Sequence, residues 1–145
     1  MQNNMNDKIF GEMQFNVGWY KIENITLWGN LYTFKIRVSA TIDEFPNDKQ
    51  QQAYLSFKEN INEISEKSLG LVNDFLQDNI SEITEEFGQP LPTKLTDVLI
   101  PNQVLFFKSG KIAVIFDVAW TDENVVLLLG QTTKVDYGYI IEGEV

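Results

Sequence analysis

The hydrophobic pattern of this chain changes its period twice, and this restricts the fold more than any other feature of the sequence. Apolar and polar residues alternate near the N-terminus, apolar residues recur in steps of three and four from residue 54, and alternation returns after residue 103. Alternation is typical of strands, and steps of three and four place side chains along one stripe of a helix. We therefore expect an α+β fold: an antiparallel sheet built from N- and C-terminal β-meanders, with a long central helix and short helices packed on one face.

The same pattern divides one domain, residues 1–145, into four segments. Residues 1–9 are polar and are expected to be flexible, 10–42 to form a β-meander, 47–100 to be helical, and 103–141 to form a second β-meander. With 145 residues, of which 43% are hydrophobic, the chain can bury a core without a metal or a crosslink.

The first meander is predicted from alternation and from one turn signal. Gly29 and Asn30 are expected to form a two-residue turn, because both tolerate positive φ. Strands are expected at 10–15, 17–22, 25–28 and 31–42. The last of these has one apolar face, comprising Phe34, Ile36, Val38, Ala40 and Ile42.

The strongest structural signal is a helical stripe in the middle of the chain, comprising Tyr54, Phe57, Ile61, Ile64, Ser68, Leu71 and Phe75. Pro46 and Asn47 mark its start. A helix over 48–79 would be about 48 Å long at about 1.5 Å per residue, which exceeds the roughly 38 Å expected across a compact domain of this size. We therefore expect a bend or break near Gly70 and docking of the helix onto the sheet; a self-pairing helix is the alternative.

Further along the chain, a short helix is expected to follow Ser81 and end at Gly88, and residues 96–100 to form a last helical turn. Strands are then expected at 104–107, 112–120, 125–129 and 135–141. The strand over 112–120 is apolar on both faces, so it is either central or buried against a second copy of the chain. The second possibility predicts a homodimer formed through Ala113, Ile115 and Ala119.

The sequence contains no histidine and no cysteine. Imidazole and thiolate are the usual proton shuttles, nucleophiles and transition-metal ligands near neutral pH. Ser-His-Asp and Cys-His catalysis, zinc fingers, iron–sulfur clusters and disulfide scaffolds are therefore excluded. Neither GxxxxGK nor GxGxxG occurs. We expect no cofactor, no bound metal and a non-catalytic role.

The negative charge is concentrated in the middle of the chain. The net charge is −10, and residues 43–87, with three basic and eleven acidic residues, carry −8 of it. This distribution disfavours nucleic acid and anionic membranes as partners. It would attract a basic protein such as a toxin, with Glu59, Glu63 and Glu66 as candidate contacts. The alternative is a solvated helical face that keeps a small protein soluble.

Two other groups of residues are candidate sites. Trp19 and Tyr20 are adjacent in an expected strand, so one points into the core and the other is a candidate anchor for a partner. Asp117 lies in an apolar strand, where burial would favour its protonated form and allow general acid or base work. Together with Asp122 and Glu123 it is a candidate ligand site, for a small molecule or a hard cation. The competing interpretation of Asp117 is a partly exposed strand residue that is paired with a lysine or accepts hydrogen bonds from backbone donors.

The first ten residues contain no apolar signal region, and no run of eighteen apolar residues occurs. From these features we expect a soluble, cytoplasmic protein.

Taken together, the chain resembles a family of small acidic bacterial proteins known only as a domain of unknown function. The resemblance covers about residues 10–141 and rests on Phe10-Gly11, Trp19, Trp28, the helix around Tyr54 and Phe57, the proline before 104–107, and the stretch 115–124. It implies the fold expected above, and it carries no information on function because no activity is assigned to the family. Asn124 and Val125 stand where the family often has His and Gly, so no role for that imidazole carries over. Proteins of this size and charge often neighbour bacterial toxins as immunity factors, which suggests an immunity-like or adaptor role by analogy.

Overall fold

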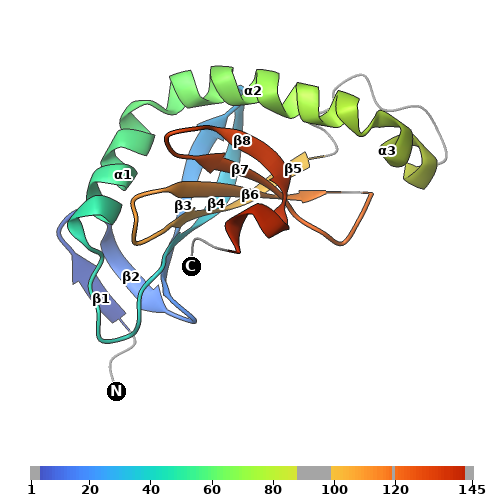
Figure 1. Ribbon diagram of the computed structural model, residues 1–145. Coiled ribbons are helices and arrows are strands. Elements are labelled where there is room, and N and C mark those ends of the chain that lie inside the picture. Colours follow the sequence, from blue (N-terminus) through green and yellow to red (C-terminus); the bar gives the residue numbers. More distant parts are fainter. Residues whose placement is uncertain (1–3, 88–98, 119, 143–145) are drawn as a thin grey trace.

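The structure is a computed structural model that describes residues 4–87, 99–118 and 120–142. Within these residues eight strands form one sheet in the order of the sequence, accompanied by three α-helices, so the mixed α+β fold is confirmed (Figure 1). The strands are β1 (Asn4–Asp7), β2 (Gly11–Phe15), β3 (Trp19–Leu27), β4 (Asn30–Val38), β5 (Leu99–Phe106), β6 (Ile112–Val118), β7 (Val125–Leu129) and β8 (Lys134–Tyr137).

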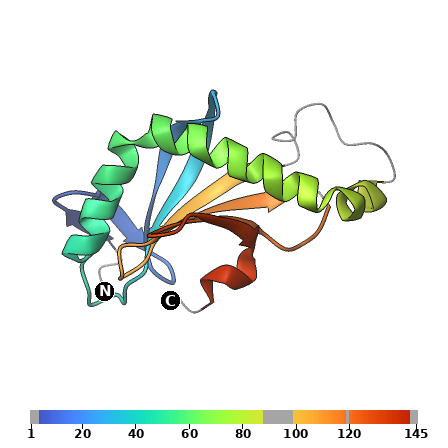
Figure 2. The same cartoon turned by 45° about the horizontal axis from the view of Figure 1, so that its top comes forward.

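The helices are α1 (Asp48–Glu59), α2 (Ile61–Asp78) and α3 (Ile80–Phe87), followed near the C-terminus by the 3₁₀ helix η2 (Gly138–Ile141). Figure 2 shows α1 and α2 arching over one face of the sheet and η2 on the opposite side. All neighbouring strands are antiparallel except β4 and β5, which run parallel. The helices lie between these two strands in the sequence, because a parallel pair needs a long crossover connection. Among the described residues, no helix combines the length and the apolar character needed to cross a membrane.

The expectation that residues 1–9 are flexible is wrong from residue 4 onward, where the chain forms β1. β1 pairs with β2 along its whole length. The Asp7 carboxylate accepts hydrogen bonds from the backbone N–H groups of Ile9 and Phe10, both at 2.9 Å, and so closes the turn between the strands. Phe10 is 1% exposed. The turn is therefore anchored in the core, which composition alone did not indicate.

The inward face of the first hairpin agrees with the sequence pattern, but its extent does not. Phe34, Ile36 and Val38 are at most 1% exposed, as expected. Ala40 and Ile42 lie beyond the end of β4 and are half-buried. β3 is one strand where the sequence predicts two.

The turn of this hairpin comes one residue earlier than expected. Trp28 and Gly29, with φ of 53° and 78°, form it in place of Gly29 and Asn30. Trp28 holds this left-handed backbone because α2 binds it twice. Its backbone N–H donates to Ser65 Oγ at 2.6 Å, and its indole Nε1 donates to Ser68 Oγ at 3.0 Å.

The central helical segment consists of two helices that meet at Asn60. Asn47 is the N-cap of α1, as its predicted place at the start of the helix requires, and it forms a capping box with Gln50. It ends where the Asn60 amide donates back to the carbonyl oxygen of Ser56 at 2.9 Å. The break expected near Gly70 is wrong, because α2 continues through that residue. The bend at Asn60 divides the length instead, and the helices dock on the sheet as expected.

The expected short helix is present as α3, while its predicted end at Gly88 lies outside the described residues. Leu99 and Ile100 belong to β5 and not to the helical turn predicted over 96–100, of which residues 96–98 also lie outside the described residues. Their pairing with β6 supplies a ladder of backbone hydrogen bonds that a single helical turn lacks.

β6 is a central strand, which was one of the two possibilities predicted for it. Ala113 and Ile115 on its outer face are 0% and 6% exposed, while Ala119 lies outside the described residues. The same chain covers this face, because Ile140 and Ile141 of η2 pack against a buried apolar cluster. The cluster comprises Phe107, Ala113, Ile115, Val126 and Leu128. The strand expected over 135–141 thus ends early and gives way to η2. A homodimer is not needed to bury this face.

Candidate functional site

The acidic residues predicted to meet a partner lie exposed at the end of α1 and on the first half of α2. Glu59, Glu63 and Glu66 are all exposed. Glu63 pairs with Lys67 at 3.2 Å, but the two side chains remain 61% and 74% exposed, and such a pair contributes only about 0.3–0.5 kcal/mol. Within the part of the chain that the structure describes, neither Glu59 nor Glu66 forms an ion pair.

This surface continues along the rest of α2 and along α3. The further exposed acids are Asp74, Asp78, Glu82 and Glu85. No lysine or arginine occurs in the sequence between residues 67 and 94. Three pairs of these acids lie three or four residues apart within one helix, so the carboxylates of each pair repel one another at a cost of about 0.2–0.5 kcal/mol. The pairs are Glu63 and Glu66, Asp74 and Asp78, and Glu82 and Glu85. We call these seven residues, from Glu59 to Glu85, the acidic helical surface.

A groove lies beside the first part of the acidic helical surface, between α1, α2 and the ends of β6 and β7. Its volume is about 440 Å³. Its apolar lining comprises Phe57, Ile64, Leu71, Ile112 and Leu129, and Glu63 and Lys67 also line it. An apolar hollow next to exposed carboxylates suits a long side chain with an apolar stem and a cationic tip.

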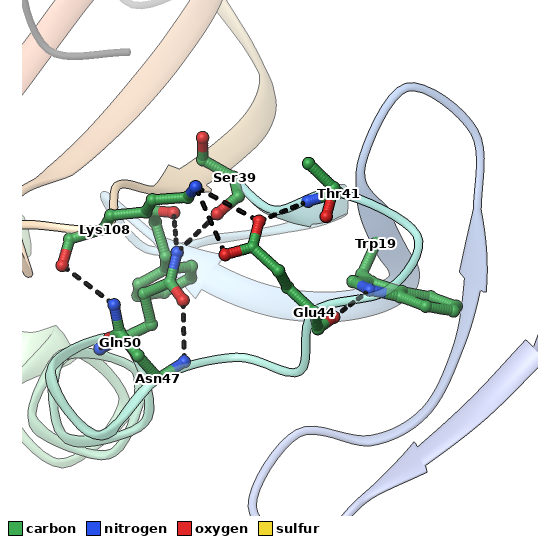
Figure 3. Close-up of polar contacts among 8 residues, drawn as sticks. Trp19, Ser39, Thr41, Glu44, Asn47, Gln50 and Lys108 are labelled. Carbon is green, nitrogen blue, oxygen red and sulfur yellow. Dashed lines mark hydrogen bonds and ion pairs between the residues drawn. The ribbon is translucent and has the colours of Figure 1, made fainter.

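Trp19 belongs to the core and not to a partner surface. It is 3% exposed, and its indole Nε1 donates to the carbonyl oxygen of Glu44 at 2.7 Å (Figure 3). The Glu44 carboxylate in turn accepts hydrogen bonds from the Thr41 backbone N–H at 2.9 Å and from the Lys108 ammonium at 3.1 Å. These hydrogen bonds lower the pKa of Glu44, and the one from the Thr41 backbone has the largest effect. Trp19 thus fixes the loop that leads into α1.

The same loop is tied to the turn between β5 and β6 (Figure 3). The Gln50 side chain is 1% exposed and donates to the carbonyl oxygens of Ser39 at 2.9 Å and Phe106 at 3.1 Å. Asn47 donates to the carbonyl oxygen of Lys108 at 3.1 Å. The start of α1 is therefore held against the C-terminal ends of the parallel strands β4 and β5.

Tyr20 points to the opposite face of β3 from Trp19. Its hydroxyl donates to Gln14 Oε1 at 3.0 Å, and the Lys35 ammonium lies 4.4 Å from its ring centroid. Tyr20 is half-buried, so it is the member of the pair that solvent reaches. The structure does not bring Trp19 or Tyr20 together with the acidic helical surface.

The carboxylates proposed as a ligand site lie on the surface. Asp117 is exposed and accepts hydrogen bonds from the amides of Asn102 at 3.1 Å and Asn124 at 3.0 Å. Asn124 also donates to the backbone of β6 at 3.1 Å. Asp122 and Glu123 are exposed. Within the described residues, no cluster of three or more acidic side chains could hold a metal ion. Asp117 is thus an exposed strand residue, but its partners are asparagine amides and not the lysine or backbone donors of the competing interpretation.

A half-buried ionic network between β3 and α1 was not predicted. The Tyr54 hydroxyl donates to Glu23 Oε1 at 2.6 Å and accepts a hydrogen bond from the Lys21 ammonium at 2.7 Å. Glu23 also forms ion pairs with Lys21 at 3.0 Å and Lys58 at 2.9 Å. The available signal was the presence of two charged residues at inward positions of a strand whose neighbours on that face are apolar.

The electrostatics of this network indicate a structural role. Burial works to raise the pKa of Glu23, but the hydrogen bonds from Tyr54, Lys58 and Lys21 outweigh it and lower that pKa. Burial and the hydrogen bond to Glu23 raise the pKa of the Tyr54 hydroxyl well above its usual range. A tyrosine held protonated and a glutamate held ionised do not exchange protons near neutral pH.

The sequence matches no family model, and comparison with curated proteins and with solved structures likewise gives no match.

Proposed function

We propose that this protein is a non-catalytic binding module of the cytoplasm, immunity-like or adaptor-like, whose acidic helical surface binds a basic protein partner such as a bacterial toxin. The observation that carries the proposal is the run of exposed acids along α2 and α3, where the sequence places a single basic residue, Lys67. Such a run costs helix stability. Local sequence features that destabilise a fold are expected at functional sites, and this cost therefore supports a function for the acidic helical surface.

The surface suits a basic partner in two ways. Its negative field raises the rate of encounter with a positively charged protein, an effect that salt screens. The groove beside Glu63 and Lys67 can then receive one long basic side chain from the partner, with the stem on Phe57 and Ile64. The analogy with small acidic bacterial proteins that neighbour toxins supports the same class of partner.

Two alternative roles compete with partner binding. A solvated acidic face that merely keeps the protein soluble would show no dependence of binding on individual glutamates. A carboxylate-based enzyme or small-ligand binder would use Asp117, Asp122 and Glu123. The exposure of Asp117 and its two asparagine partners do not favour that role.

The experiment starts with capture of partners from the native cytoplasm on the immobilised protein, followed by titration calorimetry with the purified partner. Replacing Glu59, Glu63 and Glu66 by glutamine is expected to weaken binding about tenfold, with a smaller salt dependence. The control variant carries Glu12→Gln, Asp43→Asn and Glu123→Gln, which change the net charge equally at exposed positions elsewhere. Equal affinities for the two variants, or binding that is insensitive to salt, would refute the proposal.

A further inference from the structure

A second hollow lies at the turns that join β5 to β6 and β7 to β8, which Figure 1 shows at the same end of the sheet, beside α1. Its volume is about 580 Å³, within the range of about 300–1,000 Å³ that is usual for small-molecule sites. Leu128, which is 7% exposed, and Ile140 of η2 give it an apolar wall.

The hollow is cationic in a strongly acidic protein. Lys111 and Lys134 line it, and none of the described residues that line it is acidic, although the net charge of the chain is −10. Lys49, in the first turn of α1, packs beside Gly110, where an added Cβ would lie 3.4 Å from the Lys49 Cβ. A third lysine therefore adds to the positive potential at this end of the sheet.

Neutral hydrogen-bond donors accompany the lysines. Ser109, Gln131 and Thr132, which carry hydroxyl and amide groups, also line the hollow. Gly110, with φ of 92°, makes the tight turn that brings Ser109 and Lys111 together, and the Lys111 backbone N–H donates to Ser109 Oγ at 3.3 Å. Carboxylates and phosphates accept charge-assisted hydrogen bonds from ammonium, hydroxyl and amide groups.

We propose that this hollow binds a small organic anion. Its carboxylate or phosphate group lies between Lys111 and Lys134, and its apolar part lies on Leu128 and Ile140. The hollow adjoins the groove proposed above for a partner side chain, because Gly110 and Gly130 line both, but none of its lining residues belongs to the acidic helical surface.

The test is a titration followed by heteronuclear NMR, with phenyl phosphate, benzoate, inorganic phosphate and benzyl alcohol as probes. The backbone amides of residues 109–111 and 130–134 are expected to shift and saturate with phenyl phosphate or benzoate. Whichever binds more tightly identifies the preferred anionic group. Inorganic phosphate, which lacks the apolar part, is expected to bind about tenfold more weakly, and neutral benzyl alcohol to cause no saturable shift.

Variants locate the site. Lys134→Gln is expected to weaken binding of the better aromatic anion about tenfold, and Lys111→Gln to do the same. Lys134 is exposed, so its substitution leaves the fold intact and the test stands even if Lys111→Gln fails to fold. Lys67→Gln, which removes the same charge outside the hollow, is the control. Loss of affinity in the control equal to that in Lys134→Gln, or shifts that never saturate with either aromatic anion, would overturn the proposal.

Discussion

Trp28 and Val17 both hold left-handed backbone, with φ of 53° and 60°, but only one of them is compensated. In Trp28 the strain, about 1–2 kcal/mol for a bulky residue, is offset by its hydrogen bonds to α2 and by stacking on Phe116 at a centroid distance of 5.3 Å. Val17 is 85% exposed, and the hydrogen bond that its carbonyl oxygen accepts from the Arg37 guanidinium is long, at 3.4 Å. Sequence reasoning placed the turn at Gly29-Asn30, because the serines that hold Trp28 lie far along the chain.

The substitution Val17→Asn is expected to stabilise the protein by about 1 kcal/mol, because asparagine tolerates left-handed backbone better than a β-branched residue does. Urea denaturation followed by circular dichroism measures the difference. Ile22→Asn is the matched control: Ile22 is 61% exposed on β3, where a strand conformation favours isoleucine, so this change is expected to destabilise slightly. A Val17→Asn variant less stable than the parent would contradict the strain argument.

The lowered pKa of Glu23 makes part of the stability depend on pH. Its ordinary value is 4.5. A group whose pKa is lower in the folded state contributes stability above its unfolded pKa, and this is lost as the pH falls through the folded pKa. The free energy of unfolding is therefore expected to decrease as the pH falls below 4.5. Glu23→Gln should flatten this decrease in urea titrations, whereas the exposed control Glu12→Gln should not. An unchanged acid slope in Glu23→Gln would contradict the network described here.

The start of α1 could be predicted from sequence, but the position of the helix break could not. Asn47 followed by Gln50 is a local capping signal, and it operates as expected. The low helix propensity of glycine predicts a break near Gly70. The packing of α2 against β3 and β8 overrides that small cost, and the chain bends at Asn60 instead.

Gly70→Ala is expected to stabilise the protein by about 1 kcal/mol, because Gly70 is exposed within α2 and an added Cβ has no atom within 4 Å. Thermal unfolding followed by circular dichroism measures this. In the control Gly110→Ala, the left-handed backbone, with φ of 92°, makes the same substitution destabilising. A break in α2 at Gly70 would instead leave Gly70→Ala neutral or destabilising.

At the scale of the whole molecule, the sequence pattern predicts that the N-terminal and C-terminal strands form one sheet. It does not predict that β4 and β5 pair in parallel. Alternation identifies a strand and its buried face, whereas the choice of neighbour depends on contacts between residues distant in sequence. The acidic helical surface could be predicted because its charges recur within contiguous helices. The cationic hollow could not, because its lysines come from separate turns that only the folded sheet brings together.

The most direct test of the proposed function is the affinity of the purified basic partner for a variant with Asp74→Asn, Asp78→Asn, Glu82→Gln and Glu85→Gln, measured by calorimetry together with thermal unfolding. Removing the repulsion within the pairs Asp74–Asp78 and Glu82–Glu85 is expected to stabilise the helices by about 0.4–1 kcal/mol while weakening partner binding about tenfold or more. A more stable protein that binds worse would identify these acids as a functional surface. A variant that binds its partner as tightly as the parent would contradict the claim that this surface exists for binding.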